Sequence, residues 1–157
     1  MRKKILALLL SSIAFSNVFA VEWTYVGTTT DSKTLFAYER DGIRKTSEGL
    51  LVWVAEINSN PQLPYDLMLE IYTFDCDKLK YRTEQTTFYL KGKVKHQMES
   101  DYKWVFATPG SIGEAMVDGA CNRYPSKFTF KNNDWNDLTR WGKNLLKRVK
   151  SASETSF

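Results

Sequence analysis

Two cysteines, Cys76 and Cys121, and a single histidine, His96, carry the most distinctive side-chain chemistry in this chain of 157 residues. Two thiolates and one imidazole do not complete a tetrahedral zinc shell without carboxylates. A catalytic dithiol usually has its cysteines close together, as in C-x-x-C, whereas these two lie far apart in the sequence. The cysteines therefore predict one structural disulfide, provided that the protein reaches an oxidising compartment.

The first 20 residues indicate such a compartment. A basic start, Arg2 to Lys4, precedes an apolar run over residues 5–10, and the segment ends on the small residue Ala20. This pattern is typical of a secretory signal peptide, and its apolar run is too short to span a bilayer. No cysteine follows directly for lipid attachment. We expect a signal peptide over residues 1–20 and an exported protein of the periplasm or the outer cell surface.

Composition limits the remaining chain to one globular domain. The sequence is 43% hydrophobic and has only 4 Pro and 8 Gly, which excludes a disordered or collagen-like protein. Its formal charge of +4 includes three basic residues of the predicted signal peptide. The mature protein is nearly neutral, so no nucleic acid partner is predicted.

Three lysines alternate at Lys91, Lys93 and Lys95, and His96 follows them. On an extended segment alternate side chains project to the same side. Such a basic strip could bind a sulfated glycan or an acidic protein surface. The alternative is a solvated edge whose lysines discourage edge-to-edge strand pairing. We take the strip as the first candidate for a ligand-binding surface.

Nothing in the sequence predicts catalysis. His96 lies in a lysine-rich stretch without an evident Ser or Cys partner, and no glycine-rich loop could hold a phosphate. Asp75 and Asp77 could form an acidic pair, but they flank Cys76 in what is better explained as a turn. We therefore predict a protein that is not an enzyme, with no metal site and no cofactor.

The elements that would position these residues begin with strands. Between residues 22 and 106 the sequence has short segments of period two, rich in β-branched and aromatic residues. Their connections are too short for parallel crossovers, so the strands should be antiparallel and number about six. Asp41-Gly42 predicts a tight hairpin turn, and Glu48-Gly49 a second turn.

A short helix should follow over residues 111–120. Ser111 and Glu114 have the spacing of a capping box, in which the glutamate also accepts from the amide of the cap residue. Apolar residues such as Ile112 and Met116 then recur at helical spacing. Cys121 lies at the end of this helix, so a bridge to Cys76 would attach it to the strand at residues 67–76.

A second helix is predicted over residues 134–150. Its apolar stripe includes Trp135, Leu138, Trp141 and Leu145, and its other side carries Arg140, Lys143, Lys147 and Lys150. The stripe could pack on the sheet or on a second subunit. It could also lie on an anionic membrane surface or dock into the groove of a partner. Periodicity does not separate these alternatives.

In this order the sequence features resemble the surface-adhesin protein E family of Gram-negative bacteria. The matching features are Trp23 after the signal, a turn before the strand with Trp53, Asp75-Cys76 with Arg82, and a W-x-x-x-x-P-G-S-x-G-E…C segment from Trp104 to Cys121. The resemblance covers about residues 22–121. It implies a curved sheet with a helix held by a disulfide, and a non-enzymatic surface protein that binds host matrix or plasma proteins, sometimes as a dimer.

These inferences combine into one expectation. The fold should be α+β, with a single antiparallel sheet, a short disulfide-tethered helix on one face and an additional C-terminal amphipathic helix. Residues 21–130 should form the adhesin-like domain and residues 131–157 the helix and tail. The expected function is non-catalytic binding of a host protein or glycan. The alternative is a periplasmic accessory or inhibitor-type protein that acts on another envelope protein or at a membrane surface.

Overall fold

The computed structural model describes residues 21–121, 129–132 and 134–154, so the predicted signal peptide lies outside the described residues. Within these ranges the chain forms nine strands and two helices. They are β1 (Val21–Thr28), β2 (Thr34–Glu39), β3 (Arg44–Lys45), β4 (Leu50–Asn58), β5 (Leu67–Asp75), β6 (Lys80–Leu90), β7 (Lys93–Glu99), β8 (Val105–Phe106), α1 (Ile112–Ala120), β9 (Thr129–Asn132) and α2 (Trp135–Glu154).

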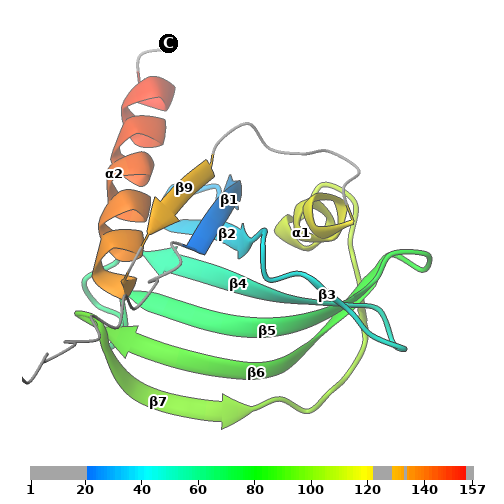
Figure 1. Ribbon diagram of the computed structural model, residues 1–157. Helices are drawn as coiled ribbons and strands as arrows, with labels where there is room; N and C mark the ends of the chain where they lie inside the picture. Colours follow the sequence, from blue (N-terminus) through cyan, green and yellow to red (C-terminus); the bar gives the residue numbers. More distant parts are fainter. Residues whose placement is uncertain (1–20, 122–128, 133, 155–157) are drawn as a thin grey trace, which may run out of the picture.

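All strands belong to one antiparallel sheet, which confirms the predicted α+β class. The order across the sheet is β7-β6-β5-β4-β2-β1-β9, and the two-residue strands β3 and β8 add to β4 and β6. The sheet curves, with α1 over one end of the long strands and α2 along the other (Figure 1). The prediction of about six strands was too low because it did not count β7 or β9. Strand β7 is exposed along its whole length and so lacks an apolar face, and β9 lies beyond residue 106, where the predicted strands ended.

A turn lies at Asp41-Gly42, but it does not close the hairpin that was predicted there. Strand β2 pairs with β1 and β4, not with β3, so no hairpin connects β2 and β3. The second predicted turn, at Glu48-Gly49, does close a hairpin, between β3 and β4, and φ of Gly49 is +147°. A Cβ atom on Gly49 would lie 2.2 Å from the carbonyl oxygen of Phe74, so this position requires glycine.

The two faces of the sheet each carry a hydrophobic core. Along β4, Val52 and Val54 point to the face that α1 covers, and Ala55 and Ile57 point to the face that α2 covers. Buried apolar residues pack with each set: Tyr38, Tyr72, Phe74, Met116, Val117 and Ala120 on the α1 face, and Trp23, Leu35, Ala37, Leu67, Leu69, Leu138 and Leu146 on the α2 face. The helices therefore lie on opposite sides of the sheet.

Helix α1 is attached as predicted. The hydroxyl of Ser111 accepts a hydrogen bond from the backbone N–H of Glu114 at 3.2 Å. The Glu114 carboxylate accepts from the N–H of Gly110 at 2.7 Å rather than from the cap residue itself. Cys121 caps the helix and forms a disulfide with Cys76, directly after β5, with the two Cα atoms 5.9 Å apart. The predicted disulfide is confirmed.

Helix α2 packs its apolar stripe on the sheet. Leu138 is fully buried, and the rings of Trp135 and Trp23 meet edge to face at 6.4 Å. Trp141 stacks on Phe130 of β9 at 5.2 Å, and Leu145 packs on the same core. Of the alternatives for this stripe, packing on the sheet is the one observed. The adhesin-like domain was predicted to end at residue 130 and the C-terminal segment to begin at residue 131, and strand β9 spans both residues.

Candidate functional site

The predicted basic strip lies at the outer edge of the sheet. Lys91 and Gly92 form the turn between β6 and β7 with positive φ angles of 52° and 72°. Lys93, Lys95 and His96 are exposed on β7. A register shift pairs Phe88 with His96 but Tyr89 with Val94, so Lys95 has no opposite residue. This bulge interrupts the expected one-sided row of lysines, and a role in ligand binding stays a prediction.

A groove of about 400 Å³ connects Lys91 with the basic side of α2. We call it the lysine groove, and its walls are α2, the connection between β4 and β5, and the β6–β7 turn. Three lysines of α2 line it at Lys143, Lys147 and Lys150. Spacings of four and three residues place them on one side of a helix. The structure thus brings Lys91 together with three lysines of α2 that are distant from it in the sequence.

Asp66 is the one carboxylate among the described residues that line the lysine groove. Its Oδ2 atom lies 3.3 Å from Nζ of Lys143, and its Oδ1 atom accepts a hydrogen bond from the backbone N–H of Lys91 at 3.2 Å. Asp66 therefore joins the β6–β7 turn to α2. Lys91 and Lys147 are exposed beside the pair of Lys143 and Asp66, so the described lining residues carry more positive than negative charge.

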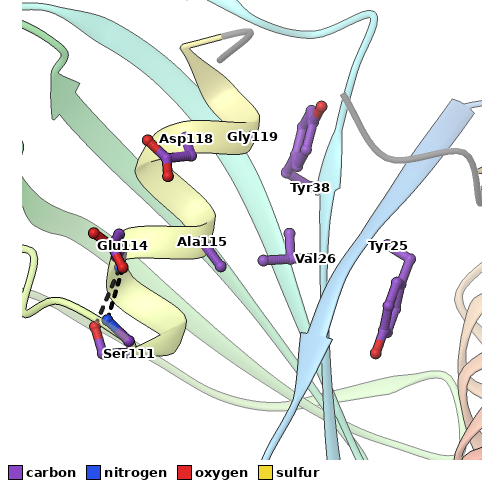
Figure 2. A pocket seen from close by; sticks show the side chains of 9 residues that line it. Tyr25, Val26, Tyr38, Ser111, Glu114, Ala115, Asp118 and Gly119 are labelled. Atoms are coloured by element: carbon purple, nitrogen blue, oxygen red, sulfur yellow. Dashed lines mark hydrogen bonds between the residues drawn. The ribbon is translucent and has the colours of Figure 1, made fainter. Parts of the chain in front are cut away.

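A second groove, of about 340 Å³, lies between α1 and strands β1 and β2. Ala115 of α1 and Val26 of β1 point toward each other across it (Figure 2). Its polar groups include the carboxylates of Glu114 and Asp118 and the hydroxyl of Tyr38. These groups are spread apart in Figure 2 rather than directed at one point. The side chains drawn there do not form an acid–base arrangement around a common substrate position.

Asp75 and Asp77 flank Cys76 at a turn, as predicted. The carboxylate of Asp75 accepts a hydrogen bond from the backbone N–H of Lys78 at 3.0 Å. It also lies 3.7 Å from Nζ of Lys80, while Asp77 is exposed. These contacts close the connection between β5 and β6 next to the disulfide.

Two glutamates that sequence reasoning missed lie on the α1 face of the sheet. Glu70 is buried on β5, and its carboxylate accepts hydrogen bonds from the hydroxyls of Tyr72 at 2.8 Å and Thr86 at 3.1 Å. Burial raises the pKa of Glu70. Burial and the nearby charge of Glu70 raise the pKa of Glu56 on β4 to about 7. The available signal was a charged residue at an inward position of an apolar strand.

Glu56 should make the stability of the protein depend on pH. Its pKa of about 7 in the folded state exceeds the ordinary glutamate pKa of 4.5, so the folded state binds more protons between these pH values. Unfolding free energy should therefore fall as the pH rises from 5 to 8, by about 1–2 kcal/mol once partial exposure of Glu56 is allowed for. Glu56→Gln should remove this part of the slope in urea unfolding measured across that range.

Glu99→Gln is the matched control, because Glu99 is an exposed glutamate of β7. This variant should keep the pH slope of the wild type. A Glu56→Gln protein whose stability still falls as steeply as that of the wild type would contradict the assignment of the slope to Glu56.

Neither helix within the described ranges combines the length and apolar character that crossing a membrane requires. A family model described as surface-adhesin protein E matches residues 23–122, which include strands β2 to β8, α1 and both cysteines of the disulfide. Comparisons with curated proteins and with solved structures gave no match. Because the family model covers well over half of the chain, the protein belongs to the surface-adhesin protein E family.

Proposed function

We propose that this protein is a non-catalytic, exported binding protein that recognises a host matrix or plasma protein or a glycan. The match to an adhesin family over residues 23–122 carries the proposal, because it covers most of the sheet together with α1. The exposed lysines of the β6–β7 hairpin and the lysine groove supply a charged surface suited to an acidic ligand. Recognition takes place on open surface and grooves.

Display on the outer cell surface separates this function from that of a periplasmic accessory or inhibitor-type protein. Lys91, Lys93 and Lys95 are exposed and should react with an amine-directed biotin reagent that does not cross the outer membrane. We expect biotinylation on intact cells, with a soluble periplasmic protein left unlabelled as the control. Labelling only after permeabilisation of the outer membrane would favour the periplasmic alternative.

Binding itself is measured with the purified protein on immobilised matrix and plasma proteins. We expect saturable binding that weakens as the salt concentration rises, because charges on an open surface are screened. A displayed protein that binds none of these ligands would contradict the adhesin function.

A further inference from the structure

We propose that the lysine groove is a binding site for a sulfated glycan chain. This inference rests on the proposed function for its ligand class and names the site and the chemistry that the function would use. The lysine groove lies between Lys91 of the β6–β7 turn and three lysines of α2, Lys143, Lys147 and Lys150.

The charge of the groove selects an anionic ligand. Lys143 already has a partner in Asp66, at 3.3 Å, and Lys91 and Lys147 are exposed along the same groove. Lysine ammonium groups are compact charges that can each meet one sulfate of a polyanion. Several such contacts along a helix side and a facing turn suit a ligand with charges repeated along a chain.

The floor of the groove favours a glycan over a membrane or a nucleic acid. Leu63, Leu90 and Leu146 line it together with Tyr65, so apolar surface lies between the lysines. Sugar rings offer C–H surface to such a floor while their sulfates reach the rim. A membrane would require these apolar groups to project beyond the charges. Binding of single-stranded nucleic acid would favour several aromatic side chains for stacking, and Tyr65 is the one aromatic among the described lining residues.

The groove is held in place before any ligand arrives. The backbone N–H of Asn58 donates to the carbonyl of Asp66 at 3.0 Å, and the N–H of Asp66 donates to that of Tyr89 at 3.0 Å. Ser59 donates through its backbone and its hydroxyl to the carbonyl of Lys33. These bonds fix the β4–β5 connection beside the end of α2 that faces the β6–β7 turn (Figure 1). A preformed groove lowers the entropic cost of binding.

The test measures binding of a fully sulfated heparin hexasaccharide to the purified exported chain by calorimetry. The groove variant is Lys147→Gln with Lys150→Gln, and the matched control is Arg140→Gln with Arg148→Gln. The control removes two positive charges from α2 at residues outside the groove. A third variant, Lys93→Gln with Lys95→Gln, tests the strip on β7. Thermal unfolding checks that each variant is folded.

We expect the groove variant to bind heparin at least ten-fold more weakly, with the control and strip variants within about two-fold of the wild type. The chemically desulfated hexasaccharide, which keeps its carboxylates, should also bind at least ten-fold more weakly to the wild type. Equal losses in all three variants would mean unspecific attraction and would overturn the proposal. A loss confined to the strip variant would overturn it as well.

Two further outcomes would also overturn the proposal of a glycan site in the lysine groove. One is the absence of heparin binding by the wild type. The other is equally strong binding to vesicles of phosphatidylcholine and phosphatidylglycerol in equal amounts, which would indicate a membrane surface. The proposed function can fail separately. If the purified protein binds heparin through the groove but is not displayed on cells, the glycan site is supported and the adhesin role is contradicted.

Discussion

Replacing Cys76 by serine should lower the free energy of unfolding by about 4 kcal/mol, the chain-entropy estimate for opening a loop of this length. The disulfide joins the end of β5 to the C-terminus of α1, and 45 positions separate the two cysteines. Cys121→Ser should cost about the same, because it removes the same bond. Urea unfolding of both variants under one set of conditions measures the two losses.

The double variant provides the control for this prediction. Cys76→Ser with Cys121→Ser should be no less stable than either single variant, and the wild type treated with a reductant should match it. Single variants that differ from each other by more than about 1 kcal/mol would show that one serine has a separate effect. Two free thiols in the native exported protein would contradict the bond itself.

Leu138→Ala should lower the free energy of unfolding by about 3 kcal/mol, within the usual range for a leucine removed from a core. Leu138 is completely buried between α2 and the sheet, in the cluster that contains Trp23 and Ile57. The backbone of α2 lies close to the sheet here, since a Cβ atom added to Gly142 would clash with Cδ1 of Ile57. Such tight packing leaves little room for the cavity to collapse.

Asn144→Ala is the matched control on the same helix, since Asn144 is exposed. It should change stability by less than about 0.5 kcal/mol. If Leu138→Ala lowers the free energy of unfolding by less than about 1 kcal/mol, the packing of α2 on the sheet is contradicted. Contact of its apolar stripe with a membrane or with the groove of a partner would then be favoured. Tryptophan fluorescence during unfolding reports on the same contact through Trp135 and Trp141.

The features predicted correctly depend mainly on neighbours in the sequence. Ser111 and Glu114 are one helical turn apart, so the cap of α1 is a local event, as the 3.2 Å hydrogen bond from the Glu114 amide shows. Cys76 and Cys121 follow from residue type and a predicted compartment. Antiparallel pairing follows from short connections.

The features that were missed depend on long-range pairing. Asp41-Gly42 has the residue types of a hairpin turn, but both edges of β2 are already used by β1 and β4. Strands β7 and β9 form at the two edges of the sheet because β6 and β1 offer them backbone partners. The raised pKa of Glu56 comes from its burial in the folded protein and from the charge of Glu70 on the neighbouring strand.

Residue types and their spacing were enough to predict the α+β class, the cysteine pair, the helix that the pair holds and the amphipathic character of α2. The packing of α2 with its apolar side on the sheet, and the groove that its lysines share with Lys91, became visible in the folded protein. Local patterns are set by bonds and contacts within a few residues. A face or a groove is set by which distant segments pair, and this depends on the packing of the whole sheet.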